Sequence, residues 1–180
     1  MTDFITADLH IGHKNILSYC PDTRQYDSVD AMNSALLSEW NSIVTPDDTV
    51  YIVGDVLMGS VNNGIGVLSQ LNGRKVLIVG NHDRGNLSNP TFVDCFEAIH
   101  DYLEIKVNKH KVVLFHYPIF EWNGMHYGSV MLHGHVHQNK TGMEEYRIRN
   151  VGIDATGKVV SILTDVVADA IQGRIRIRCE

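Results

Sequence analysis

Three apolar segments of strand length each run directly into a short polar cluster, and this repeated arrangement constrains the fold more than any other feature of the sequence. The predicted strands are residues 3–7, 49–53 and 75–79, and aspartate, asparagine or histidine follows each of them. In open α/β sheets, ligand sites form outside the carboxyl ends of the strands, where such loops meet. The sequence therefore predicts an α/β sheet with a functional site at one edge.

The second half of the chain is richer in β structure. Residues 102–107 and 112–115 flank a turn-like segment at 108–111, which predicts a hairpin. Further strands are expected at 129–132, 146–151 and 159–163. Residues 174–178 alternate Arg with Ile, as a half-exposed edge strand does. With Arg147 and Arg149, these arginines predict either a basic face or an ordinary amphipathic edge, and we favour the edge.

Helices are expected between the strands. Residues 28–43 carry apolar side chains at helical spacing, with Asp27 or Ser28 as the N-cap. Shorter helices are predicted at 64–71 and at about 164–171, where Thr164 is a candidate cap. Residues 11–27 show no clear periodicity and predict a loop over the mouth of the site.

The strand at 129–132 leads into a histidine-rich segment that ends at His137. His135 and His137 lie at alternate positions, so in an extended chain they project from the same side with Cα atoms roughly 6.5 to 7 Å apart. Two imidazoles so placed can reach two metal ions separated by about 3.5 to 4 Å, the spacing of dinuclear hydrolytic centres. By itself the segment predicts a histidine-rich surface strand equally well.

The composition indicates one globular domain spanning residues 1–180, because 180 residues with 44% hydrophobic content can bury a sizeable core. The net charge of −6 favours a small substrate over long nucleic acid. Cys20, Cys95 and Cys179 form no CxxC pair, and no apolar run provides a signal peptide or the roughly 20 residues of a membrane helix. We therefore expect a cytoplasmic protein without a membrane partner, and its oligomeric state stays open.

Taken along the chain, the polar clusters resemble the motifs of the calcineurin-like metallophosphoesterases in order and spacing. The clusters are Asp8-Leu9-His10, Gly54-Asp55, Gly80-Asn81-His82-Asp83, His116 and Gly134-His135-Val136-His137. The resemblance covers residues 8–137, and the segment Leu71-Asn72-Gly73-Arg74-Lys75 is similar to a compact single-domain branch found in bacteria and phages. It implies an α/β (α+β) fold, a four-layer αββα sandwich of two mixed β-sheets flanked by helices.

The resemblance also implies a centre of two divalent metal ions. Asp8, His10 and His137 would hold one ion, Asn81, His116 and His135 the other, and Asp55 would bridge both. This mixture of imidazole, carboxylate and amide suits Mn, Fe, Zn, Co or Ni better than Ca, and Mn²⁺ is our first choice. A hydroxide that bridges the ions would attack phosphorus.

By the same resemblance, the catalytic residues are His82 and Asp83. His82 would protonate the leaving oxygen as an imidazolium, while Asp83 would orient it and favour its charged form. Gly54, Gly80 and Gly134 would let the backbone turn tightly beside the metal ions.

Other residues are weaker candidates for contact with the substrate. Arg84 could clamp a phosphate oxygen, although it could equally be an ordinary solvated arginine, and Arg24 is a weaker candidate of the same kind. His13 and His126 lie in predicted loops near the motifs and could touch the substrate. The other histidines are interpreted as surface, loop or structural residues: His100, His110 and His133.

The resulting hypothesis is a metal-dependent phosphodiesterase or phosphatase that acts on small or nucleotide-like phosphate esters. The sequence does not separate monoesters from diesters, because the same two-metal core serves both. One alternative is a nuclease that acts on nucleic-acid ends, and the acidic net charge argues against it. The other is a non-catalytic metal-binding module, which is disfavoured because no residue of the motif set is missing.

Overall fold

The computed structural model describes residues 1–59 and 61–176, and it arranges the chain around two mixed sheets. The first sheet has the order β4-β3-β2-β1-β9, in which β1 to β4 are parallel and β9 is antiparallel to β1. Its strands are β1 (Asp3–Thr6), β2 (Thr49–Ile52), β3 (Arg74–Ile78), β4 (Ala98–His100) and β9 (Ser161–Ile162). The three strands predicted in the first half of the chain are thus confirmed, and β4 was not predicted.

The second sheet has the order β5-β6-β7-β8, with an antiparallel β5–β6 hairpin and parallel pairs beyond it. Its strands are β5 (Leu103–Val107), β6 (His110–Leu114), β7 (Val130–His133) and β8 (Ile148–Asn150). The four-residue turn predicted at 108–111 is too long, because Val107 already pairs with His110. Asn108 makes the shorter turn possible with a φ of +54°, a conformation that asparagine tolerates better than most residues. His100 and His110 therefore lie in strands, half-buried, and not in surface loops.

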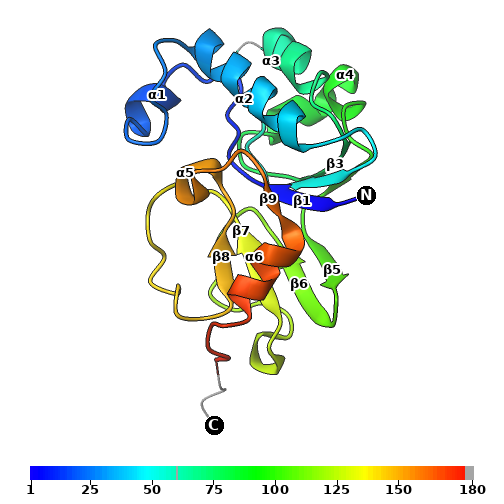
Figure 1. Ribbon diagram of the computed structural model, residues 1–180, viewed down its shortest axis with the longest axis vertical. Helices are drawn as coiled ribbons and strands as arrows, with labels where there is room; N and C mark the ends of the chain where they lie inside the picture. Colours follow the sequence, from blue (N-terminus) through cyan, green and yellow to red (C-terminus); the bar gives the residue numbers. More distant parts are fainter. Residues whose placement is uncertain (60, 177–180) are drawn as a thin grey trace.

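Most helices cover the outer face of the first sheet (Figure 1). Of the two predicted cap candidates, Ser28 caps α2 (Val29–Ile43), because its side chain accepts a hydrogen bond from Ala31 N at 3.1 Å. The predicted helix at 64–71 lies three residues earlier, and its Gly64 packs so closely on Leu57 that a Cβ would come within 3.2 Å of Leu57 Cβ. Thr164 lies inside α6 (Leu163–Ala170) and does not cap it. The helices are α1 (Ile16–Tyr19), α2 (Val29–Ile43), α3 (Val61–Leu68), α4 (Pro90–Val93), α5 (Ile153–Thr156) and α6 (Leu163–Ala170), with 3-10 helices η1 (Arg84–Ser88) and η2 (Met125–Tyr127).

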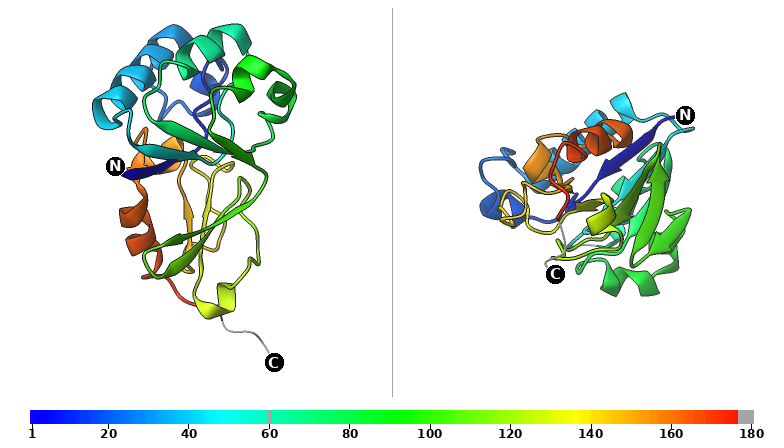
Figure 2. Two further views of the ribbon diagram at one scale, coloured as in Figure 1. Left: turned by 90° about the vertical axis from the view of Figure 1, so that its right-hand side faces the viewer. Right: turned by 90° about the horizontal axis from the view of Figure 1, so that it is seen from below.

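The layers follow from which face of each sheet is apolar. Ile5 and Val53 of the first sheet face Leu114 and Leu132 of the second in a fully buried interior. On the far side of the first sheet, Trp40 and other apolar residues of α2 and α3 form a second core. In the left view of Figure 2, these helices lie on one side of the first sheet and the second sheet lies on the other.

The outer face of the second sheet is covered by the chain between β6 and β7, which includes η2. Val113 and Met131 pack there against Trp122 and Met125. Together with α6, which contacts both sheets, this completes the predicted sandwich of two mixed sheets flanked by helices. The fold expected from the resemblance is confirmed.

The arginine-rich C-terminal segment is not an edge strand where the structure describes it. Arg174 makes a single parallel bridge to Tyr146, and Arg178 and Cys179 lie outside the described residues. Arg149 pairs with Asp169 at 2.5 Å between Nε and Oδ2, so it does not contribute a free charge to a basic face. Within the described residues, every helix falls short of the length and apolarity that crossing a membrane would require.

Candidate metal centre

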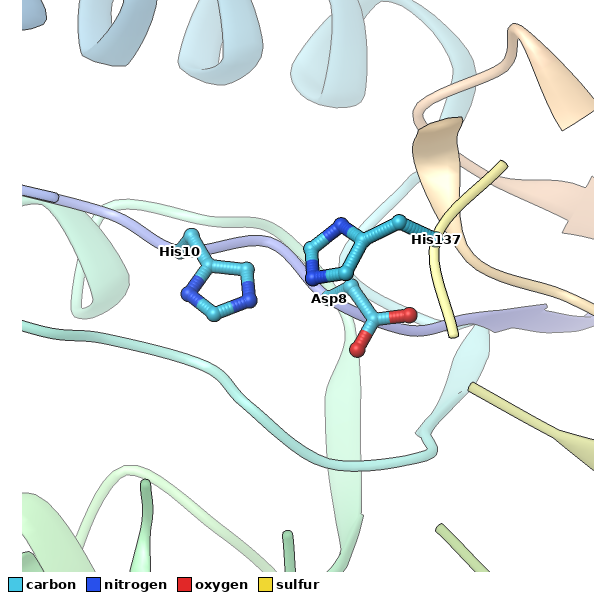
Figure 3. Close-up of side chains that lie close together, drawn as sticks. All are labelled: Asp8, His10 and His137. Carbon is cyan, nitrogen blue, oxygen red and sulfur yellow. The ribbon is translucent and has the colours of Figure 1, made fainter. Parts of the chain in front are cut away.

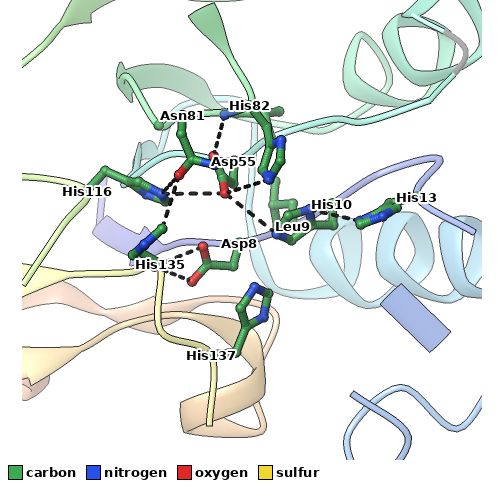
Figure 4. Close-up of polar contacts among 12 residues, drawn as sticks. Asp8, Leu9, His10, His13, Asp55, Asn81, His82, His116, His135 and His137 are labelled. Atoms are coloured by element: carbon green, nitrogen blue, oxygen red, sulfur yellow. Dashed lines mark hydrogen bonds and ion pairs between the residues drawn. The ribbon is translucent and has the colours of Figure 1, made fainter. Parts of the chain in front are cut away.

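The carboxyl ends of five parallel strands from both sheets meet at one place, and the predicted ligands lie there (Figure 4). In the first sheet, β1 is followed by Asp8 and His10, and β2 by Asp55. From the strand ends at this place come all seven residues predicted to hold metal ions: Asp8, His10, Asp55, Asn81, His116, His135 and His137. Two sheets are needed to assemble the set, because each supplies only part of it.

The backbone at this place is strained. Among the described residues, six other than glycine have a positive φ between 50° and 72°, a conformation that costs an L-residue about 1 kcal/mol or more. One is Asn108 in the β5–β6 turn, and the other five belong to the predicted ligand set: Asp8, His10, Asp55, His135 and His137. Strain concentrated in this way is typical of functional sites, where the surrounding structure over-determines the geometry.

Asp8, His10 and His137 form the first cluster, in which one ligand atom from each residue lies within 4.8 Å of the others (Figure 3). Burial raises the pKa of Asp8 to about 6 and lowers the pKa of His10 to about 3, so His10 is neutral and has a free lone pair. The Nε2 atom of His10 is buried and has no hydrogen-bond partner. A buried nitrogen with a free lone pair is costly unless it binds something, and a metal ion fits that requirement.

Asp55, His116 and His135 form the second cluster on the same 4.8 Å criterion. Asn81 joins it, because its Oδ1 lies 3.0 Å from both His116 Nε2 and His135 Nδ1. The Nδ1 of His116 donates to the backbone oxygen of Val53 at 2.8 Å, which directs Nε2 toward Asn81 and Asp55. The cluster offers two imidazoles, a carboxylate and an amide oxygen, a donor set that suits transition-metal ions.

Asp55 lies between the two clusters. Its Oδ2 is 3.4 Å from His116 Nε2 in the second cluster and 3.7 Å from His10 Nε2 in the first. Its Oδ1 accepts a hydrogen bond from the backbone N of His82 at 3.0 Å. Burial alone would raise the pKa of Asp55, but the hydrogen bond and the charge of His116 outweigh it and lower the pKa to about 2. Asp55 is therefore ionised and faces both clusters.

Glycines make the close packing around these residues possible. A Cβ on Gly134 would lie 2.7 Å from Ala7 Cβ and 2.8 Å from Asp8 Oδ2, distances that real Cβ atoms essentially never show. A Cβ on Gly54 or Gly80 would collide with His116 or Asp55, respectively. These three positions thus accept glycine and no larger residue without a collision. The residues present fit divalent metal ions in chemistry and in packing.

His82 lies at the edge of the site, where its side chain is 36% exposed and its Nε2 is 3.9 Å from Asp55 Oδ2. The prediction that Asp83 orients His82 is wrong. The carboxylate of Asp83 is fully buried and accepts hydrogen bonds from three backbone N–H groups, those of Asp55, Val56 and Gly80, at 2.8 to 2.9 Å. Those donors would otherwise be buried without partners, so Asp83 fixes the two loops that carry Asp55 and Asn81. Burial also raises the pKa of Asp83.

Of the four substrate-contact candidates, the structure brings His13 to the cluster, with its Nδ1 3.3 Å from His10 Nδ1. Arg84 pairs with Asp101 at 3.0 Å on the surface, and both side chains are more than half exposed. His126 lies on η2, where it contacts Glu121 and the backbone oxygen of Arg176. These contacts do not connect Arg84 or His126 with the metal centre.

The expectation that Arg24 contacts the substrate is wrong, since the residue is only 2% exposed. Its guanidinium instead binds Asp154, and Asp154 binds the Nδ1 of His137 at 2.6 Å. Asp154 was not predicted, although the sequence carried a signal. Strand β8 is followed by Gly152 and, two residues later, by Asp154, an arrangement similar to Gly54-Asp55 after β2 but with one residue inserted.

Comparison with known proteins identifies relatives in phages and archaea. The chain is 31% identical over 187 residues to the Gene 66 protein of Mycobacterium phage L5, covering 88% of this chain and 89% of that protein. It is 31% identical over 149 residues to the uncharacterized protein MJ1445 of Methanocaldococcus jannaschii, covering 82% of this chain and 74% of that protein. Among solved structures, AQ665 of Aquifex aeolicus, a protein of unknown function, has a TM-score of 0.67 and 26% identity, covering 85% and 90% of the two chains. No protein-family model matches the chain.

Two mixed sheets whose strand ends bring together aspartate, asparagine and histidine side chains describe the architecture of this class of protein. The chain belongs to the same family as the Gene 66 protein of Mycobacterium phage L5, which matches it along most of both chains.

Proposed function

We propose that the protein is a phosphoesterase that holds two divalent metal ions, Mn²⁺ first among them, and hydrolyses small or nucleotide-like phosphodiesters. The observation that carries this proposal is the position of Asp55, whose Oδ2 lies 3.4 and 3.7 Å from ligand nitrogens of the two clusters. A carboxylate shared by two dications partly neutralises them and fixes their separation. The resemblance of the ordered motifs to those of the calcineurin-like metallophosphoesterases supports the same reaction class.

Each cluster would hold one ion, with Asp55 common to both. The first position would use Asp8, His10 and His137, and the second Asn81, His116 and His135. Bound divalent ions polarise phosphoryl oxygens and lower the pKa of a water between them. The protein contributes the fixed geometry, because its ligands already converge in strained backbone conformations.

His82 is the residue placed to move a proton. Its ring lies beside the clusters and is 36% exposed, so it can reach both the site and a bound ester. A protonated imidazole there can donate from Nε2 to the oxygen of the leaving group, which typically contributes about 10²- to 10⁴-fold to the rate.

The charges around the site support a diester over a monoester. A phosphomonoester carries nearly two negative charges at neutral pH, whereas a diester carries one. Both arginines expected to clamp phosphate are engaged elsewhere, Arg24 with Asp154 and Arg84 with Asp101. Neither guanidinium is therefore free to stabilise the second negative charge of a monoester. A diester carries no second charge and does not need such a partner.

The test is hydrolysis of bis(p-nitrophenyl) phosphate and p-nitrophenyl phosphate by metal-stripped protein resupplied with Mn²⁺. We expect the diester to turn over faster, and His110→Ala, which removes a histidine of the β5–β6 hairpin, to leave that rate unchanged. Faster monoester hydrolysis would contradict the diester preference. If neither ester is hydrolysed while two ions are bound, the enzyme proposal is contradicted and a non-catalytic module is supported. If the protein hydrolyses only nucleic-acid ends, and does so at a rate that falls steeply with added salt, a nuclease is supported.

A further inference from the structure

Arg24 is an arginine that sequence patterns place in a loop and the structure buries beside the first cluster. Its Nε donates to Asp154 Oδ1 at 2.7 Å and its Nη2 to Asp154 Oδ2 at 3.0 Å, a bidentate pair in which both side chains are at most 1% exposed. Thr23 adds a hydroxyl hydrogen bond to Asp154 Oδ1 at 2.6 Å. A buried charge pair of this kind is tolerated only if its donors and acceptors form hydrogen bonds, and both oxygens of Asp154 do so here.

The other side of Asp154 faces a predicted metal ligand. Its Oδ2 lies 2.6 Å from His137 Nδ1. An ionised carboxylate can only accept, so Nδ1 of His137 carries the proton and donates it to Asp154. In a neutral imidazole this leaves the lone pair on Nε2, the atom then available to a metal ion.

Arg24 also binds the backbone of the segment that carries Asp8, another residue of the first cluster. Its Nη2 donates to the backbone oxygen of Asp8 at 2.6 Å and its Nη1 to that of Leu9 at 3.3 Å. Asp8 has a φ of +57°, so these bonds hold a strained residue whose carboxylate belongs to the first cluster. One guanidinium thereby connects Asp8, through its backbone, with His137, through Asp154.

The second cluster is supported by other means. The Nδ1 of His116 is fixed by the backbone oxygen of Val53, and Asp83 holds the loops that carry Asp55 and Asn81. The contacts of Arg24 and Asp154 described above reach the first cluster. Support by a charged pair is therefore specific to one of the two metal positions.

We propose that Arg24 and Asp154 are positioning residues that fix the tautomer of His137 and its distance from Asp8, and so set the affinity of the first metal position independently of the second. The inference rests on the proposed two-ion centre. Outer partners of ligating histidines typically change metal affinity by about 10- to 100-fold.

Cys20 lies close enough to suggest a different use of the same residues. Its Sγ is 3.7 Å from His137 Nδ1. One possible ligand atom from each of Cys20, His137 and Asp154 lies within 4.8 Å of the other two, so the three residues could hold a cation. Each oxygen of Asp154 already accepts two hydrogen bonds, and Arg24 places a positive charge beside it. A cation there would be repelled and would find no free carboxylate oxygen, which favours the positioning role.

The experiment compares Mn²⁺ binding by metal-stripped wild-type protein and two variants, using isothermal titration calorimetry and equilibrium dialysis. Arg24→Met with Asp154→Leu removes both charges together, so neither is left buried and unpaired. We expect the wild type to bind two equivalents and the double variant to bind one of them about 10- to 100-fold more weakly while the other is unchanged. Asp169→Ala, which breaks the Arg149–Asp169 pair on the surface, is the matched control and should bind both equivalents normally.

Asp154→Asn keeps the shape and decides the matter if the double variant does not fold. An amide has one acceptor oxygen and one NH₂ group, so it cannot accept from Thr23, from both Arg24 nitrogens and from His137 as the carboxylate does, and the tautomer of His137 is no longer fixed. Long-range ¹H–¹⁵N NMR of the metal-free protein, with His137→Gln to assign the signals, should show Nδ1–H in the wild type and a new population with Nε2–H in Asp154→Asn.

The outcomes separate the two proposals. A wild type that binds fewer than two equivalents contradicts the two-ion centre, and the tautomer measurement, which needs no metal, then judges the positioning role alone. Equal weakening of both equivalents in the double variant means a general structural role and overturns the inference. An unchanged tautomer in Asp154→Asn, with unchanged binding of both equivalents, overturns it as well.

Discussion

The two candidate metal clusters meet the same chemical requirement in different ways. Each contains a histidine whose Nδ1 is fixed by a hydrogen bond, but the acceptor is the buried carboxylate of Asp154 for His137 and the backbone oxygen of Val53 for His116. The first cluster thus depends on a charged pair between residues 130 positions apart, and the second on the backbone of the strand end itself. A side chain can be substituted and a backbone oxygen cannot, so the partner of His137 can be changed by mutation and the partner of His116 cannot.

The difference also has an energetic side. Removing one member of a buried ion pair leaves the other charge unpaired, at a typical cost of about 3–5 kcal/mol. A histidine held by a backbone oxygen carries no such risk. The first cluster should therefore be the more fragile half of the centre, and four substitutions break or sharpen that contrast.

Asp55→Asn should have the largest effect, because it removes the carboxylate that lies between ligand nitrogens of both clusters. We expect the affinity for both Mn²⁺ equivalents to fall by more than about 100-fold, which exceeds the typical effect of losing an outer partner of a ligand. Diester hydrolysis should be lost together with the metal ions. Calorimetric titration of the stripped variant and the hydrolysis assay measure the two quantities. A variant that kept one ion at wild-type affinity would show that Asp55 belongs to a single cluster.

His82→Ala should leave both clusters intact and reduce the rate. The ring lies outside the ligand sets, so we expect two Mn²⁺ equivalents with normal affinity and a loss of about 10²- to 10⁴-fold in kcat. The same titration and steady-state kinetics test this expectation. Loss of metal in this variant would overturn the role assigned to His82.

Asp83→Asn should act on the second cluster through its loops. A carboxylate that accepts three backbone N–H groups becomes an amide with a single acceptor oxygen, so at least one buried donor loses its partner, at a cost of about 1–3 kcal/mol in the free energy of unfolding. Urea denaturation of the metal-free protein measures this change. Asp94→Asn, at an exposed site on the same stretch of chain, should stay within about 0.5 kcal/mol of the wild type. If both variants unfolded alike, the three hydrogen bonds would contribute nothing.

Arg84→Ala should have the smallest effect. Arg84 forms an exposed ion pair with Asp101, and such pairs contribute about 0–1 kcal/mol. We expect KM for the diester to change by less than about twofold, because removing an exposed pair leaves the site itself unaltered. Steady-state kinetics with bis(p-nitrophenyl) phosphate test this, and a large rise in KM would restore the hypothesis that Arg84 clamps the substrate.

The sequence was most informative where a residue follows its strand directly. Asp8, Asp55 and His116 follow apolar segments, where the sequence predicted a site and the family resemblance implied ligands, and the structure brings them together because parallel strands end at the same edge of a sheet. It was least informative where a side chain reaches across the fold. Nothing local distinguishes Arg24, which binds a partner 130 residues away, from a solvated arginine.

Asp83 illustrates the same limit at short range. Adjacency to His82 suggested that one orients the other, but neighbouring residues at the end of a strand point in different directions, and Asp83 turns inward to three N–H groups of the loops beside it. Similarly, His126 was assigned to the site from its place in the chain, while the fold carries η2 to the outer face of the second sheet.

The sequence by itself indicated an α/β sheet with polar clusters at its strand ends, because periodicity predicts the strands and each strand delivers the residues that follow it. The family resemblance of these clusters supplied the candidate ligands, their division into two sets and the place of Asp55 between them. Only the tertiary structure decided that Asp154 and Arg24 support one of these sets and that Asp83 turns away from His82. The physical reason is that hydrogen bonds and charges act over a few ångströms in space, whatever the separation along the chain.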